Sequence, residues 1–463
     1  MIVLEQVALS GAPDRHRGTG DAARRWTSSL VAGIVFTSLL IFLYIVEISP
    51  IYRSSKVVYA RPDVTPLTVS CLMLLGLSMV LPRSLSRPSA VVVWLLFLTV
   101  VVSTSTIPFF TIPISGVTIT SIDYLRYISV QDACFLGLIV ILRIQRMRSP
   151  RVHVRLRPWQ FSRLLVIATV TSIVLILSGF GFSLVNLVSI ATPYEQRFAY
   201  AAASQSNGLA TYALFTLAFA LVPMLMSVGL HYRRWPLVVL SLVSAVLAYG
   251  VTAFRMALLM PFLAAGMVLV VRWSKRRYPF ILAAGLCAVM LAGSAIRLTT
   301  GSPQAIALGT VRTIITPATI TPFYVDFYSH HPRHELDYSL LAGVTKSPYD
   351  RVPPLVIGRQ YYGDDVTSEN TQFWADSYAN FGYVGLVVFT LLLTLILLTF
   401  DRACRLLPLE ISAAVAAVFA SNLANGGLLT AIGSLGFGFV LLLITFAPRE
   451  RDRDGATSVL VEP

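Results

Sequence analysis

Residues 249–259 read YGVTAFRMALL and place one arginine, Arg255, between two apolar segments, 236–253 and 256–271. No polar loop separates the segments, so the stretch predicts a hairpin of two membrane-crossing helices. A charge at this depth costs about 2.5 kcal/mol or more on the scale from insertion experiments, and such charges are usually kept for a function. The stretch therefore predicts a membrane protein in which Arg255 is a candidate functional residue.

Composition supports the same class for the whole chain. Of 463 residues, 56% are hydrophobic and only 13% are charged, and the mean hydropathy is +0.74. Soluble domains carry about 25% charged residues. We therefore predict an all-α polytopic membrane protein with the lipid bilayer as a partner, and exclude a soluble enzyme with a single anchor. The net charge of +14 is interpreted as a topology signal, with no nucleic-acid partner.

Apolar runs of about the length of a bilayer crossing recur along the chain. They cover residues 28–47, 67–82, 89–107, 127–143, 162–182, 208–229, 236–253, 256–271, 279–296, 382–400, 410–424 and 427–447. With a cytoplasmic N-terminus and alternation thereafter, 24 of the 36 basic residues fall on the inner side and six in short outer loops. Basic residues accumulate on the cytoplasmic side, and short loops decide orientation. The sequence thus predicts about twelve spans with both termini in the cytoplasm.

This topology divides the chain unevenly between the two sides of the membrane. The predicted parts are a cytoplasmic arm (1–27), spans one to nine (28–296) with an outer loop (183–207), a long extracytoplasmic loop (297–381), spans ten to twelve (382–447) and a cytoplasmic tail (448–463). The first apolar run has no small-residue cleavage site after it and is interpreted as a membrane helix. Because long loops are often functional, we expect 297–381 to form short helices and one wall of a cavity.

The long loop supplies candidate acids and bases. Its histidines, His330, His331 and His334, follow no common metal-ligand spacing, and a solvated turn is the favoured interpretation. We expect no metal site and no cofactor. Asp326 and Glu335 are candidate general bases, although most of the loop's eight acidic residues are expected to be solvated because a reaction needs at most one base.

Two short motifs and the loop between them carry a family resemblance. The motifs are TAFRMAL at 252–258 and FWADSYANFGYVG at 373–385. With a long outer loop before the last spans, they resemble the O-antigen polymerase and ligase-like family, specifically oligosaccharide repeat-unit polymerases. Some members carry an arginine followed after ten residues by glycine in two outer loops. Arg197 and Gly208 fit that spacing, whereas the long loop has only the looser pair Arg359 and Gly363.

The resemblance implies a glycosyltransferase similar to the type C membrane enzymes. It would take a glycan from a polyprenyl diphosphate carrier at the outer face of the plasma membrane and join it to a second lipid-linked glycan. Arginines would hold the diphosphate leaving group, where charge builds up in the transition state, and no metal would be needed. Implied partners are lipid-linked oligosaccharides, a flippase and a chain-length regulator.

The candidate site residues follow from position and residue type. Catalytic candidates are Arg255, Arg197, Asp326 and Glu335, and substrate-binding candidates are Arg359, Arg312, Tyr194, Tyr200, Tyr361, Trp374 and Asn380. Arginine forks suit phosphates, aromatic rings suit sugar faces, and Asn380 could cap a helix whose amides attract an anion.

Simpler interpretations of these residues stay open. Arg255 could cap the hairpin and extend to the interface, and Arg197 could pair with Glu195. The tyrosines could be packing residues, and Asn380 a plain cap. Other functions also stay open: a glycan ligase, or a transporter of lipid-linked glycan or polysaccharide. A transporter would need polar groups at the midplane of several spans, where this chain has few, such as Asp132 and Asn422.

Overall fold

The computed structural model describes residues 17–52, 61–145, 156–182, 185–186, 194–275, 277–338 and 347–448. Within these ranges the chain forms helices and turns and no β-strand. Nine helical runs there are long and apolar enough to cross a membrane. They are Ser29–Ile51, Ser89–Thr111, Ser121–Ile144, Pro158–Phe180, Gly208–His231, Trp235–Thr252, Arg255–Trp273, Tyr278–Thr300 and Phe373–Ala403. The prediction of an all-α polytopic membrane protein is therefore confirmed.

Several of these runs contain more than one helical element. The elements up to residue 180 are α1 (Arg17–Leu43), η1 (Tyr44–Ile48), α2 (Ser49–Ile51), α3 (Val64–Val80), α4 (Ser89–Leu96), η2 (Phe97–Val101), α5 (Val102–Thr104), α6 (Pro108–Thr111), η3 (Ile112–Ile114), α7 (Ser121–Ile144) and α8 (Pro158–Phe180). Those from 194 to 300 are α9 (Tyr194–Ser204), α10 (Gly208–Thr216), η5 (Leu217–Leu221), α11 (Val222–His231), α12 (Trp235–Thr252), α13 (Arg255–Trp273) and α14 (Tyr278–Thr300). The remainder are α15 (Gln304–Ile306), η6 (Ala307–Ile315), α16 (Thr316–His330), α17 (Pro353–Tyr362), α18 (Phe373–Ala403), η7 (Cys404–Leu406), α19 (Leu409–Leu423), α20 (Leu428–Ile432) and α21 (Phe437–Thr445).

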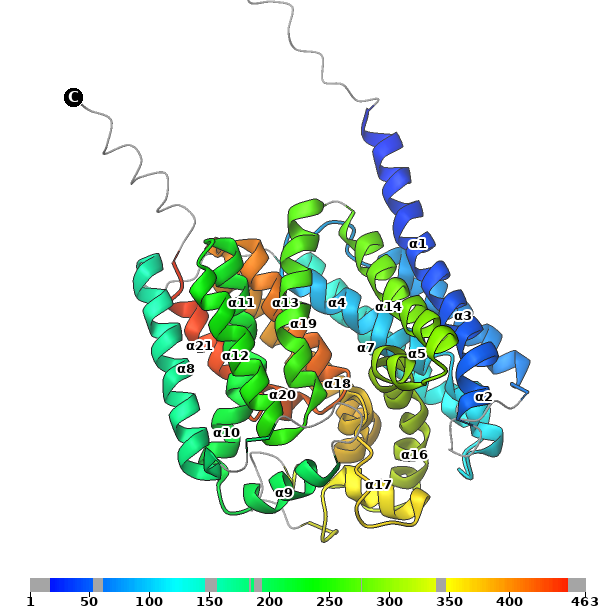
Figure 1. The fold of residues 1–463 in the computed structure, drawn as a ribbon. Coiled ribbons are helices and arrows are strands. Elements are labelled where there is room, and N and C mark those ends of the chain that lie inside the picture. The colour runs from blue at the N-terminus through cyan, green and yellow to red at the C-terminus, as the bar shows by residue number, and fades with distance from the viewer. Residues whose placement is uncertain are drawn as a thin grey trace, which may run out of the picture.

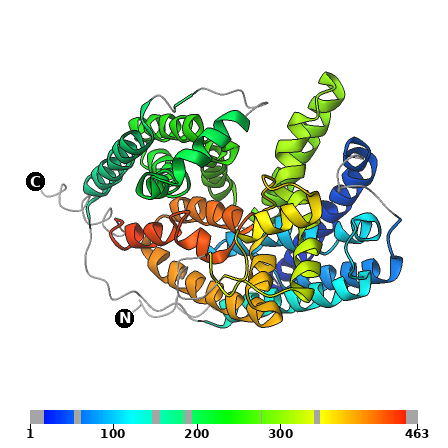
Figure 2. The same cartoon turned by 90° about the horizontal axis from the view of Figure 1, so that it is seen from below.

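The bundle has a buried centre, and apolar side chains are exposed on its peripheral helices. The helices from α8 to α13 group on one side of α19, and α1, α3, α7 and α14 lie on the other (Figure 1, Figure 2). The apolar window in Ser89–Thr111 is buried throughout, as expected for a helix that is hydrophobic on all sides. On α8, by contrast, Ile167, Val170 and Val174 are exposed. Apolar side chains that stay exposed on a peripheral helix are suited to contact with acyl chains.

Three of the predicted spans correspond to shorter helices. The second is α3 and the eleventh is α19, both below 18 residues. The last is divided into α20 and α21 at residues 433–436. A bilayer crossing needs about 20 apolar residues when the helix is continuous. The helix lengths alone therefore support nine crossings among the described residues, and the twelve-span count stays a prediction.

The long loop forms short helices in its described part, as predicted. It holds α15, η6, α16 and α17, while α14 extends to Thr300 and α18 begins at Phe373, ahead of the predicted span. Residues 317–328 of α16 are all buried, and α16 packs against α5, α6, α7 and α18. The loop therefore contributes a helix to the protein core, which its aromatic content makes possible.

Helix α18 is interrupted by a kink at Phe381 and Gly382. Phe381 has φ −141° and ψ 16°, and Gly382 has φ 60° and ψ −142°. The second conformation is essentially restricted to glycine. A Cβ at residue 382 would also lie 2.5 Å from Nη2 of Arg333, so the guanidinium would have to move. The kink therefore depends on glycine at this position.

Replacing Gly382 by alanine should lower the stability of the folded protein. The backbone strain is expected to cost about 1–3 kcal/mol. The matched control is Gly285→Ala in α14, where, apart from its two chain neighbours and the nearby backbone of its own helix, no heavy atom of the described residues lies within 4 Å of the new Cβ. That change should be neutral or stabilising by about 0.5–1 kcal/mol. Thermal unfolding of both variants in detergent tests this, and equal midpoints would contradict the argument.

Candidate functional site

Helices α12 and α13 form the hairpin predicted around Arg255. Ala253 joins them in the left-handed region (φ 52°, ψ 22°) and is fully buried. Thr252 closes the turn, because its Oγ1 donates to the Ala248 carbonyl at 2.7 Å and accepts from the Phe254 N–H at 3.0 Å. Arg255 is the first residue of α13 and is half-buried. A non-glycine residue in this conformation is uncommon, and such strain is often found at functional sites.

Helix α9, from the predicted outer loop 183–207, lies against this turn. Nε2 of Gln196 donates to the carbonyls of Gly250 and Val251, both at 3.0 Å. The backbone N–H of Asn186 also donates to Gly250, at 3.0 Å. Gln196 is 6% exposed, so these hydrogen bonds are shielded from water and hold the loop in place.

Arg197 reaches the same turn from α9. Its Nε and Nη2 each lie 3.4 Å from the Ala253 carbonyl oxygen. Its guanidinium also lies over the Phe254 ring, 5.5 Å from the centroid. Arg197 thus contacts the two residues that precede Arg255 in the turn. Two permanently charged forks near one turn form an arrangement suited to phosphate.

The two tyrosines of this loop differ in their surroundings. Tyr194 is the first residue of α9, and its side chain lies outside the described part. Tyr200 is 6% exposed and packs against Phe180, Phe215 and Phe254. Its ring therefore anchors α9 to the hairpin, and it supports the position of Arg197 in this way.

Asp326 and Tyr361 belong to a second group of polar residues. The Asp326 carboxylate accepts hydrogen bonds from Thr118 N at 3.1 Å, Ile119 N at 3.2 Å, Thr118 Oγ1 and Tyr361 Oη. Asp326 is 5% exposed, and Tyr361 stacks on Phe323 with centroids 4.6 Å apart. This network joins α16 and α17 to the segment before α7. To act as a base, Asp326 would have to exchange one of these donors for a substrate.

The remaining predicted charges lie on the surface. Glu335 is exposed and has a φ of 51°. Arg359 is 59% exposed and pairs with Asp365 at 3.4 Å and Asp350 at 3.9 Å. Arg312 is exposed on η6, and it opposes the rise that burial causes in the pKa of Glu369. The carboxylates beside Arg359 reduce its net attraction for a diphosphate, whereas Glu335 and Arg312 are accessible.

Trp374 and Asn380 are interior residues. Trp374 is fully buried, and its Nε1 donates to Thr390 Oγ1 at 2.9 Å. Asn380 is fully buried just before the kink in α18. Its Oδ1 accepts from the Leu336 N–H at 2.8 Å, and its Nδ2 donates to Tyr338 Oη at 2.6 Å. Asn380 therefore fixes the 335–338 turn rather than capping the start of a helix.

The structure corrects the interpretation of His334. His330 and His331 are exposed, but His334 is fully buried. Its Nδ1 lies 2.9 Å from Oδ1 of Asp337, and its ring contacts the rings of Tyr338 and Tyr349. The expected solvated turn is therefore wrong at this residue, because the aromatic side chains that follow it close over the imidazole. The aromatic density of the loop was the available signal.

The burial of His334 predicts a pH dependence of stability. Burial lowers the pKa of His334, and Asp337 opposes this. A depressed histidine pKa means that the unfolded state binds the proton first, so stability falls as the pH drops below about 6.5. His334→Asn should reduce the loss of stability between pH 7.5 and 5.5, whereas His330→Asn should not. Thermal unfolding at both pH values tests this, and an identical loss in His334→Asn would exclude the effect.

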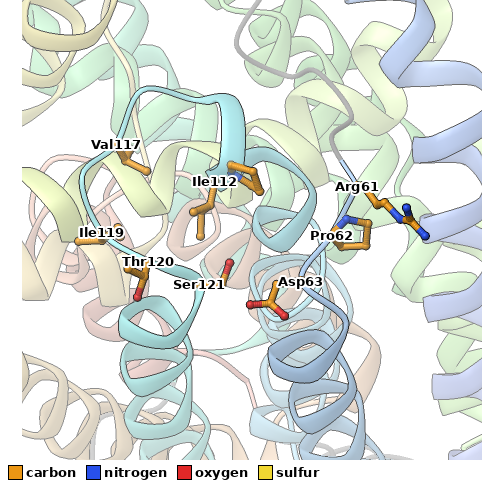
Figure 3. A pocket seen from close by; sticks show the side chains of 9 residues that line it. Arg61, Pro62, Asp63, Ile112, Val117, Ile119, Thr120 and Ser121 are labelled. Atoms are coloured by element: carbon orange, nitrogen blue, oxygen red, sulfur yellow. The ribbon is translucent and has the colours of Figure 1, made fainter.

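A surface cavity of about 540 Å³ lies between the start of α3 and the start of α7. Its lining residues are Arg61, Pro62, Asp63, Ile112, Pro113, Val117, Ile119, Thr120 and Ser121. Asp63 and Ser121 face each other across it, while Arg61 points away (Figure 3). It contains none of the predicted site residues, but the Asp326 network holds Ile119 in its wall.

α9 and α17 both lie at the end of the bundle where α12 and α13 meet (Figure 1). The turn that bears Arg255 and the loop that holds His334 and Glu335 come from segments that lie far apart in the sequence. Within the described ranges, no three His, Cys, Asp or Glu side chains gather in a metal-binding group. Comparison with protein-family models, with curated proteins and with solved structures found no match to this chain.

Proposed function

We propose that this chain is a glycosyltransferase that polymerises polyprenyl-diphosphate-linked oligosaccharide repeat units. The observation that carries the proposal is the approach of Arg197 to the turn that bears Arg255. The predicted topology puts this turn at the outer face of the plasma membrane. Two guanidinium groups at the end of an apolar hairpin suit a ligand with a diphosphate head and a long apolar tail.

The arrangement suggests a mechanism. A hydroxyl of the acceptor glycan attacks the anomeric carbon of the donor, and the bond from this carbon to the diphosphate oxygen breaks. The diphosphate leaves with the electron pair, and Arg255 and Arg197 stabilise its increasing negative charge. A base takes the hydroxyl proton. Glu335 is the more accessible candidate, whereas Asp326 already accepts four hydrogen bonds.

The proposal depends on twelve spans with cytoplasmic termini. Reporter fusions after Asn207 and Leu340 should report outside, and a fusion at the C-terminus should report inside, because the basic residues concentrate in the predicted inner segments. Leu340 lies outside the described residues. A cytoplasmic signal at Leu340 would remove the long loop from the outer face, and the proposed function would fail with it.

A direct assay separates this function from its alternatives. Purified protein should convert lipid-linked repeat units into a ladder of longer products and release polyprenyl diphosphate. A ligase would instead transfer finished polymer to a different acceptor. A transporter of lipid-linked glycan or polysaccharide would move its substrate across a proteoliposome membrane without forming a bond. Polymer formed in the presence of a chelator supports the arginine mechanism, and loss of polymer there supports a metal mechanism. Partners expected in the cell are a flippase and a chain-length regulator.

A further inference from the structure

A second group of arginines lies in a cavity remote from the candidate site. The cavity has a volume of about 430 Å³, and Arg83, Arg87, Arg143, Ser86 and Ser89 line its polar part. We call it the arginine pocket. It is formed by the segment between α3 and α4, the start of α4 and the end of α7. These segments are predicted to lie on the cytoplasmic side, opposite the turn that bears Arg255.

Two of these arginines are held by the ends of neighbouring helices. Nη1 of Arg87 donates to the Leu142 carbonyl at 2.8 Å and the Gln145 carbonyl at 3.3 Å. Nη2 of Arg143 donates to the carbonyls of Val80 and Leu81. A guanidinium has five N–H donors, and these bonds use one terminal nitrogen of each group. The side chains are thus fixed in place, and each guanidinium has further N–H donors beyond these bonds.

The charge of the pocket is only partly balanced. No carboxylate of the described residues forms an ion pair with Arg87 or Arg143. Asp401 is close by, but it is 1% exposed and accepts from Ser89 N at 2.9 Å and Ser89 Oγ at 2.6 Å. Burial and the charge of Arg143 both lower the pKa of Arg83, which indicates that these cations repel each other. An anion between them would relieve the repulsion.

The remaining wall of the pocket is apolar. Ala90, Val93, Ile139 and Leu142 line it, and each is 7% exposed or less, so this wall presents only a small apolar surface. A soluble anion would use only the arginines. A lipid would place its phosphate among the arginines and its glycerol carbons against the small exposed part of the apolar wall.

We infer that the arginine pocket binds the phosphodiester headgroup of an anionic phospholipid of the cytoplasmic leaflet. Basic pockets between membrane helices on that side are suited to such headgroups, and arginine forks match phosphate oxygens. The site is independent of the proposed glycan chemistry. It lies at the Ser89 end of the Ser89–Thr111 run, whereas Asp326 binds Thr118 and Ile119, which follow the other end. Binding here would stabilise the packing of α3 against α7.

The test measures lipid binding to the purified full-length chain in neutral detergent. Phosphatidylglycerol and phosphatidylcholine with identical acyl chains are titrated, with inorganic phosphate as a competitor. Phosphatidylglycerol should bind at least about tenfold more tightly, and Arg87→Gln or Arg143→Gln should weaken it by about tenfold or more. Arg402→Gln is the matched control, because Arg402 is exposed near Asp401 but does not line the pocket. It should leave binding unchanged.

A further variant serves as the control for misfolding. Arg87 and Arg143 also hold helix ends, so loss of either side chain can disturb the fold as well as the ligand. Arg83→Gln removes the third guanidinium and should give the same loss of phosphatidylglycerol affinity in a protein with unchanged circular dichroism. Unchanged affinity in the double variant that carries both Arg83→Gln and Arg143→Gln overturns the inference. Equal binding of both lipids, or displacement of the lipid by low millimolar phosphate, overturns it as well.

Discussion

Replacing Arg255 by alanine should slow the polymerisation of lipid-linked repeat units by roughly ten- to a few hundred-fold. Hydrogen bonds to charged groups contribute about 1.5–3 kcal/mol each, and a contact made to the leaving diphosphate acts on the transition state. Arg255→Lys keeps the charge but loses the two-pronged geometry, so it should restore activity only in part. The measurement is turnover of purified protein, with and without a chelator.

The control for Arg255 is an arginine at the same predicted face. Arg126 is 73% exposed and pairs with Asp123 at 3.4 Å, so Arg126→Ala should leave turnover close to that of the wild type. Full activity in Arg255→Ala would refute its role. Loss of wild-type activity on addition of chelator would replace the arginine mechanism with a metal mechanism.

Arg197→Ala should reduce polymer formation about tenfold or more at unchanged protein level. Its guanidinium contacts both the Ala253 carbonyl and the Phe254 ring, so its loss removes a cation and also loosens α9 on the hairpin. Arg197→Lys should lie between the alanine variant and the wild type, since an ammonium lacks the planar fork needed for both contacts and the phosphate.

The Arg197 experiment separates a role in binding phosphate from a role in holding α9. Gln196→Ala removes the hydrogen bonds to Gly250 and Val251 but leaves both arginines. If Gln196→Ala lowers activity as much as Arg197→Ala, the effect arises from the position of α9. Because Arg197 contacts the turn that bears Arg255, the double variant Arg197→Ala with Arg255→Ala should lose less than the product of the two single effects. Wild-type polymer from Arg197→Ala would remove this residue from the site.

The helical class was predictable because membrane crossing leaves a strong local pattern. The hairpin around Arg255 is a case in point: two apolar runs without a polar linker require two helices and a short turn. The end of the last predicted span was less predictable. Residues 433–436 (Gly-Ser-Leu-Gly) divide it into α20 and α21, and hydropathy averaged over a whole span does not register so short a break.

The positions of candidate site residues were predictable only where residues nearby in the sequence set the surroundings of the side chain. The family resemblance suggested Arg197, and the position of Arg255 in the hairpin suggested Arg255, but the contact of Arg197 with the hairpin was not predicted. For Tyr200, packing was one of the two interpretations that the sequence left open. The burial of His334 was not predicted, because it depends on the rings of Tyr338 and Tyr349 packing over the imidazole and on the contact of its Nδ1 with the Asp337 carboxylate. Trp374 and Asn380 resemble exposed site residues in the sequence, but both are fully buried.

By itself, the sequence determined that the chain is a bundle of apolar helices and that Arg255 stands at the tip of a hairpin. These features are local, since a bilayer requires each crossing segment to satisfy its own backbone hydrogen bonds. The tertiary structure decided which charges are accessible and which are enclosed. It brought Arg197 to Ala253, enclosed His334 and engaged Asp326 with Thr118 and Ile119. Those outcomes depend on contacts between residues far apart in the chain, where burial and partners, rather than residue type, set the properties of a polar group.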